Sequence, residues 1–95
     1  MPCFQLIRRH DGLTYHFAAH PARARCYVRS DLEITWEDDL GWVMRDPHDG
    51  ALTGRVWHIA VSDQDAIPPA TCWVTAKAGK SYVYDLRYGA HGSPP

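Results

Sequence analysis

Long apolar runs are absent from this chain. A membrane-spanning helix needs about 20 consecutive apolar residues, and the apolar segment 3–7 is cut short by Arg8 and Arg9. The interruption also leaves this segment too short for the hydrophobic region of a secretory signal peptide. We therefore expect a protein of the cytoplasm that has no contact with a membrane.

Cysteine is scarce and signature motifs are missing. Cys3, Cys26 and Cys72 are widely spaced and odd in number, which argues against a disulfide framework or a Cys-rich zinc site and favours reduced, mostly buried thiols. There is no Gly-rich phosphate loop, nucleophile elbow or His-Glu-x-x-His segment. The sequence therefore predicts neither a cofactor nor a metal.

An excess of one charge is also lacking, since the formal net charge is −1. The two signs are nevertheless separated along the chain: arginines concentrate in residues 1–30 and acidic residues in 31–70. Such separation can pair strands within the fold, pair two copies of the chain, or present a basic face to a polyanion. Ninety-five residues provide one domain with one core. We place this domain at residues 1–88 and expect a flexible tail over 89–95.

What the chain does contain is alternation. Every second residue from Ala24 to Trp36 is apolar or small, which is the period of a strand with one buried face. Asp11-Gly12 between two alternating segments predicts a hairpin. Strands are expected over 3–9, 13–17, 24–36, 42–45, 55–61, 71–77 and 81–87. The prediction is an all-β domain, a small antiparallel barrel or sandwich of six or seven short strands. The alternative is an α+β fold with one short helix over 21–29, begun by Pro21.

The same alternation sorts the large aromatic side chains. Trp36, Trp42 and Trp57 fall on the apolar faces of their segments, so we expect them to be mostly buried. Trp73 shares its face with Thr75 and Lys77, and is expected in solvent.

Tyr27 is in the same position, since it lies on the polar face of its segment between Arg25 and Arg29. A large ring beside a cation on a solvated sheet face suits contact with a ligand or a partner.

The leading functional hypothesis is a small non-enzymatic protein that recognises a protein partner or a small aromatic or anionic ligand on a sheet face. A second copy of the chain would also cover such a face, so we expect self-association, most simply as a dimer. The residues assigned to this surface are Tyr27, Arg25, Arg29, Trp73, Lys77 and His58.

Two alternatives remain open. Nucleic-acid binding would use the basic and aromatic residues Arg23, Arg25, Arg29, Lys77 and Lys80 with Tyr27 and Trp73. A small enzyme would use His58, expected in mid-strand, or His16, with its site at a subunit interface. His16 and His20 are four residues apart, but on a strand this spacing separates them by about 13 Å, too far for them to share one metal ion.

Overall fold

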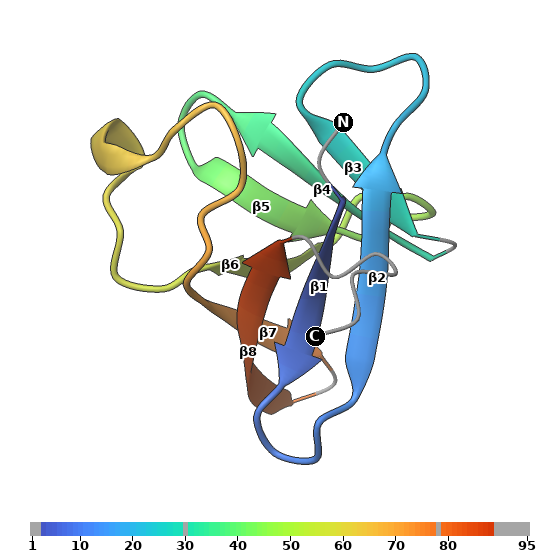
Figure 1. The fold of residues 1–95 in the computed structure, drawn as a ribbon, viewed down its shortest axis with the longest axis vertical. Coiled ribbons are helices and arrows are strands. Elements are labelled where there is room, and N and C mark those ends of the chain that lie inside the picture. The colour runs from blue at the N-terminus through green and yellow to red at the C-terminus, as the bar shows by residue number, and fades with distance from the viewer. Residues whose placement is uncertain (1–2, 30, 78, 89–95) are drawn as a thin grey trace.

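The computed structural model describes residues 3–29, 31–77 and 79–88, without the side chain of Lys77. These residues form eight strands and one short 3₁₀ helix (Figure 1). The strands are β1 (Cys3–Arg8), β2 (Thr14–Ala19), β3 (Cys26–Arg29), β4 (Leu32–Glu37), β5 (Gly41–Arg45), β6 (Leu52–Val56), β7 (Cys72–Lys77) and β8 (Lys80–Tyr88), and the 3₁₀ helix η1 is Val61–Asp63. The predicted tail, 89–95, lies outside the described residues.

The strands form a closed antiparallel barrel. Each strand pairs with the next in the chain, and β8 pairs with β1 to complete the ring. The all-β prediction is confirmed, and the barrel rather than the sandwich is the correct form of it. The number of strands is eight and not six or seven. Two assignments made from the sequence were wrong, and the first of them accounts for the additional strand.

The first error concerns residues 24–36, which form two strands and not one. The chain turns between Arg29 and Leu32, and these two residues face each other in the β3–β4 pair. A two-residue connection changes which residues point inward, from odd numbers in β3 to even numbers in β4. Tyr27 therefore points inward opposite Ile34, and the alternation that seemed continuous crosses a hairpin.

The second error concerns residues 55–61. The strand there is β6, which ends at Val56, and residues from Trp57 onward leave the sheet. Trp57 is consequently 51% exposed, contrary to the prediction. Trp42 is fully buried as expected, whereas Trp36 is only partly buried at one end of the barrel.

The alternative helix over 21–29 does not form. Residues 21–25 make the connection from β2 to β3, and His20 Nδ1 accepts hydrogen bonds from the backbone N–H groups of Ala22 and Arg23, both at 3.0 Å. Arg25 then takes a positive φ of 54°, which ends any helical path. Within the described part of the chain, no helix is long and apolar enough to cross a membrane.

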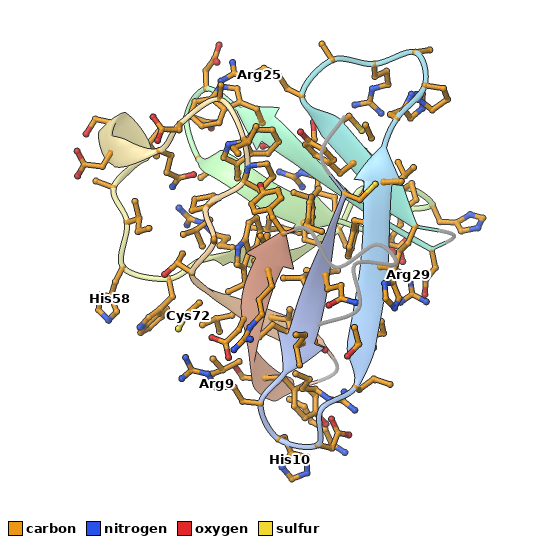
Figure 2. The ribbon with its side chains drawn as sticks, viewed as in Figure 1. Arg9, His10, Arg25, Arg29, His58 and Cys72 are labelled. Carbon is orange, nitrogen blue, oxygen red and sulfur yellow. The ribbon has the colours of Figure 1, made fainter. Side chains whose placement is uncertain are left out.

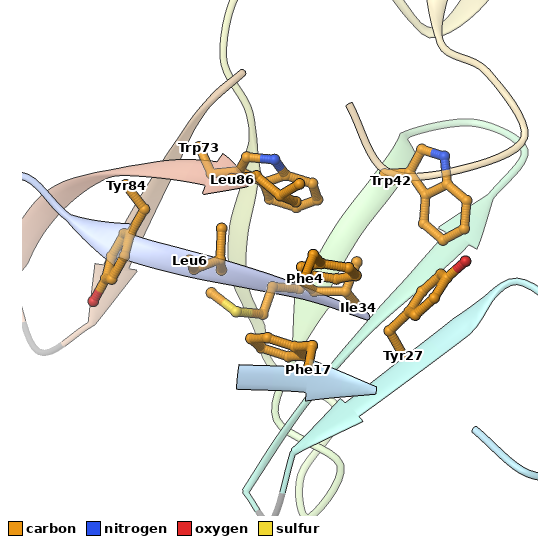
Figure 3. Packing of buried hydrophobic residues seen from close by; sticks show 10 residues of the cluster. Phe4, Leu6, Phe17, Tyr27, Ile34, Trp42, Trp73, Tyr84 and Leu86 are labelled. Carbon is orange, nitrogen blue, oxygen red and sulfur yellow. The ribbon is translucent and has the colours of Figure 1, made fainter. Parts of the chain in front are cut away.

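The interior of the barrel is mostly aromatic (Figure 3). Its buried residues are Phe4, Leu6, Phe17, Tyr27, Ile34, Trp42, Met44, Trp73, Tyr84 and Leu86. Phe4 stacks on Phe17 with ring centroids 5.3 Å apart. Eight-stranded barrels leave an interior just wide enough to be filled by side chains or to hold one small ligand, so the two ends of this interior decide whether a ligand can enter.

Candidate ligand-binding site

The two ends of the barrel differ. The hairpins β1–β2, β3–β4, β5–β6 and β7–β8 turn at one end, which we call the open end, with connections of two to six residues. The other end carries the long connection 57–71 between β6 and β7, which we call the plug loop; in Figure 1 it runs through η1.

The plug loop is held to the barrel by partly buried hydrogen bonds. Gln64 Oε1 accepts from the backbone N–H of Trp42 at 2.9 Å, and the Trp42 indole donates to the Asp65 carbonyl at 3.0 Å. The Trp73 indole donates to the Pro69 carbonyl at 3.3 Å. The Tyr88 hydroxyl donates to the carbonyl of Pro68, a buried residue. This end is therefore filled by the chain itself.

A glycine allows the plug loop to approach so closely. A Cβ at Gly41 would lie 2.6 Å from Gln64 Oε1, and Gly41 has a φ of +78°. Any other residue would displace Gln64 and would be strained at that φ.

The open end contains a cavity of about 240 Å³. Residues from seven strands and two hairpin turns surround it: Arg8, Tyr15, Asp31, Leu32, Met44, Asp46, Thr53, Thr75, Tyr82 and Tyr84. Three of the walls are tyrosine rings, and the deepest residues, Met44, Thr75 and Tyr84, are buried. The mouth of a β-barrel is a common position for a small-molecule site.

Gly54 helps to shape the floor of this cavity. A Cβ there would lie 2.9 Å from the Met44 methyl group and 3.1 Å from the Thr75 methyl group. The missing side chain lets Met44 and Thr75 pack toward β6, since a side chain at 54 would push both into the space where a ligand would lie.

Arg8 continues the inward face of β1 after Phe4 and Leu6, and lies opposite Tyr84 in the β1–β8 register. Its guanidinium makes a two-bond ion pair with Asp11, at 2.9 and 2.6 Å, and stacks over the Tyr82 ring with 4.6 Å to the centroid. The hydrogen bonds from Arg8 and from the Leu13 backbone hold the pKa of Asp11 far below its ordinary value. Arg8 is thus fixed in place by Asp11 and by the Tyr82 ring, and its guanidinium also interacts with the Tyr84 side chain.

Arg29, one of the predicted site residues, is also at the open end. Its guanidinium lies 4.2 Å from the centroid of the Tyr15 ring, and its Nε is 3.4 Å from Asp31 Oδ1. Tyr15 in turn stacks on Tyr84 with centroids 5.8 Å apart. Burial, followed by the neighbouring Tyr15, raises the pKa of Tyr84, with Arg8 acting in the opposite direction. Tyr84 is therefore a neutral phenol at physiological pH.

The prediction that Trp73 and Tyr27 face solvent was wrong. Trp73 is 0% exposed and Tyr27 is 7% exposed, and both belong to the core inside the barrel. Cys72, Val74 and Ala76 had suggested a core face for β7, but the interior has room for the large ring of Trp73, while Val74 pairs with exposed Val83 outside. Neither ring can contact a ligand on an outer sheet face.

The remaining predicted site residues are divided between the two ends. Arg25 precedes β3 and lies 4.4 Å from the centroid of the Trp36 ring at the plugged end, whereas Arg29 is at the open end. His58 is exposed in the plug loop and not in mid-strand, with φ +64° and its ring 4.5 Å from the Trp57 ring. Lys77 ends β7 at the open end, opposite Lys80, and its side chain is outside the described structure.

Among the described residues, the geometry supplies no partner side chain for an enzyme site based on His16 or His58. His16 is exposed, and its Nδ1 is 3.3 Å from Gln5 Nε2. None of the described hydrogen bonds joins a histidine ring to a cysteine or a carboxylate side chain. Among the described side chains, no group of three His, Cys, Asp or Glu is arranged to hold a metal ion.

Two other features lie on the outer surface. Arg9 forms a two-bond ion pair with Asp85, at 3.0 and 2.8 Å, and its Nη2 is 3.0 Å from Cys72 Sγ (Figure 2). A shallow groove of about 320 Å³ crosses β6 and β7 and includes Leu52, which is 41% exposed, and Trp57. The charges of Arg9 and Asp85 neutralise each other. The groove is shallow, so its walls enclose little space.

Sequence reasoning missed Arg8, Tyr15, Tyr82, Tyr84, Thr75 and Asp46 as site residues. A signal existed in β1, where Phe4, Leu6 and Arg8 alternate on one face. An arginine that continues an apolar face just before a hairpin turn marks the place where a barrel interior reaches solvent.

Comparison of the chain with protein-family models, with curated proteins and with solved structures gave no match.

Proposed function

We propose that this protein binds a small molecule with an aromatic or apolar body in the mouth of its barrel and does not transform it chemically. The observation that carries the proposal is the cavity at the open end, walled by Tyr15, Tyr82 and Tyr84, at the one end that the plug loop leaves unfilled. Its volume of about 240 Å³ suits a molecule smaller than a typical drug.

The arrangement of the cavity supports binding over the other hypotheses. Its polar groups come from different strands and converge on one space, as in ligand sites that fix an orientation. Nucleic-acid binding is less well supported, because Arg25 and Arg29 lie at opposite ends of the barrel and Arg23 pairs with Glu33 at 3.3 Å. The leading hypothesis from the sequence is therefore retained for a small ligand, with the site moved from an outer sheet face to the interior.

A filled-mouth variant tests the proposal. Leu32 lines the cavity and is only partly buried, so Leu32→Trp should place its extra volume in the mouth and spare the core. The matched control is Ile67→Trp, on the plug loop, where the side chain is 44% exposed. The probes are phenol, benzylamine, benzoate and L-phenylalanine, and binding is followed by backbone-amide NMR.

We expect at least one probe to shift amide signals around Thr75 and Tyr84 in a saturable manner. Leu32→Trp should weaken that binding at least about tenfold, equivalent to about 1.4 kcal/mol, while Ile67→Trp leaves it unchanged. If no probe binds, or if Leu32→Trp binds as well as the original protein, the cavity is not a ligand site.

A further inference from the structure

The charges at the open end are placed on opposite sides of the cavity. Arg8 ends β1, and Asp46 directly follows β5. In the closed order from β1 to β8, β1 and β5 are four strands apart in both directions, so they are diametrically opposed. Both residues line the cavity, and the tyrosines come from β2 and β8, the two strands beside β1.

On the β1 side, Arg8 is ready to receive an anionic group. Asp11 occupies its Nε and Nη2, and the Tyr82 ring covers one face of the guanidinium, which fixes its orientation. A guanidinium has five N–H donors, so Arg8 keeps donors beyond the two used by Asp11 even though its side chain also interacts with Tyr84. Guanidinium groups bind carboxylates through such donors. The neutral Tyr84 hydroxyl, on the residue opposite Arg8, adds a polar group beside it.

On the β5 side, Asp46 offers a carboxylate. Its Oδ1 accepts a hydrogen bond from the backbone N–H of His48 at 2.8 Å, which orients the group within the turn. Asp31, the other lining carboxylate, is already paired with Arg29. Among the described side chains, the ion pairs join Arg8 to Asp11, Arg9 to Asp85, Arg23 to Glu33, Arg29 to Asp31 and Arg45 to Glu37, so Asp46 is in none of them.

Between these two charges the walls are tyrosine rings, Leu32 and Met44. We infer that the ligand is a small zwitterion of amino-acid size, whose acidic group binds Arg8, whose ammonium group binds Asp46, and whose apolar or aromatic body contacts the tyrosines. This inference rests on the proposed function and specifies its ligand class.

Three probes that differ only in their charged groups test the inference. L-phenylalanine carries both groups, phenethylamine lacks the carboxylate, and hydrocinnamate lacks the amine. Titration calorimetry of the full chain should give at least about tenfold tighter binding of L-phenylalanine than of either single-charge probe. If one single-charge probe binds as tightly as L-phenylalanine, the zwitterion is wrong but the cavity remains a ligand site. If none of the three binds, and no neutral aromatic binds either, the proposed function fails as well.

Two substitutions assign each charge to its side of the cavity. Asp46→Asn should weaken L-phenylalanine and phenethylamine at least about tenfold and leave hydrocinnamate unchanged; the control is Asp65→Asn at the plugged end. Arg8→Gln should weaken L-phenylalanine and hydrocinnamate but not phenethylamine, and Arg8→Lys should restore part of the loss because it keeps the charge.

A third substitution tests whether Lys77 pairs with Asp46. Lys77 ends β7 at the same end of the barrel as Asp46. If Lys77→Gln increases the affinity for phenethylamine, Lys77 neutralises Asp46 in the free protein and the inference is overturned. Unchanged affinity supports it. An Asp46→Asn variant whose affinity for all three probes falls equally also overturns the inference, because the carboxylate would then have a structural role.

Discussion

Two arginines at the open end, Arg8 and Arg29, are each held at both the edge and the face of the guanidinium. Arg8 and Arg29 contact an aspartate through nitrogen and a tyrosine ring through the plane of the guanidinium. Exposed ion pairs contribute little to stability by themselves, so we assign these contacts a positioning role. They keep two long, flexible side chains from collapsing into the mouth of the barrel.

Buried Trp73 and exposed Trp57 provide a matched pair for stability. Trp73→Ala removes a ring that is fully enclosed, so we expect the free energy of unfolding to fall by about 3–5 kcal/mol. Trp57→Ala should lower it by less than about 1 kcal/mol. Urea denaturation of both variants measures the difference, and equal losses would show that the ring of Trp73 is not enclosed.

Alkaline pH should destabilise the protein through its enclosed tyrosines. Burial raises the pKa values of Tyr27, Tyr84 and Tyr88 in the folded state. Below the ordinary value of about 10, both folded and unfolded chains keep these protons and no dependence arises. Above it the unfolded chain loses them first, so the free energy of unfolding falls, by up to about 1.4 kcal/mol per pH unit for each tyrosine.

Denaturation at a series of pH values, together with phenolate absorbance, measures this effect. Tyr84→Phe removes one titrating group and should give a shallower decline than the original protein. An identical decline in the two proteins would mean that Tyr84 ionises freely in the folded state.

At the scale of elements, the plug loop acts as the closed end of a container. It contributes no strand, yet its polar atoms satisfy the backbone of Trp42 and the indoles of Trp42 and Trp73. A buried donor without an acceptor is costly, so the loop is part of the barrel's stability. Its irregular path does not imply mobility.

Gln64 is the residue through which this role can be measured. Gln64→Ala removes the acceptor of the Trp42 backbone N–H, and we expect a loss of about 1–3 kcal/mol in the free energy of unfolding. The control is Asp63→Ala, exposed in the neighbouring 3₁₀ helix and expected to change stability by less than about 0.5 kcal/mol. An unchanged free energy of unfolding in Gln64→Ala would show that water replaces the amide of Gln64.

The alternation of apolar and polar residues along the strands could be predicted from the sequence. Which of the two alternating faces points into the barrel could not. Strand content and the β1–β2 hairpin follow from local sequence, because alternation and Asp-Gly act over a few residues. Which face points inward depends on the connection, and a two-residue turn exchanged the faces of Tyr27 and its neighbours without interrupting the apolar pattern. The cavity at the open end could not be predicted from the sequence either. Its walls come from strands that are brought together only when the barrel closes.

At the scale of the whole molecule, closure depends on one pairing of distant segments. All strand pairings join neighbours in the chain except that of β1 with β8, whose register runs from Phe4–Tyr88 to Arg8–Tyr84. Closure removes the edges that an open sheet would expose to other chains. It also places Arg8 beside Tyr84, so an open form of the sheet would not contain the cavity.

Hydrogen exchange tests closure directly. In a closed barrel, the amides of β1 and β8 have partners on both sides and should exchange about as slowly as those of β4 and β5. In an open sheet, β1 and β8 would be edge strands and would exchange much faster than the central ones. Fast exchange confined to β1 and β8 would therefore contradict the closed barrel.

The open end carries its tyrosines and its carboxylates on different parts of the fold. The tyrosines are on strands, whereas Asp11, Asp31 and Asp46 are in hairpin turns. Lengthening such a turn is cheap, with about 0.6 kcal/mol for each doubling of its length. New turn sequences grafted between β1 and β2 or between β5 and β6 could therefore change the charge that a ligand meets, while the aromatic container stays the same. If the proposed function holds, the barrel is a scaffold for engineered small-molecule receptors.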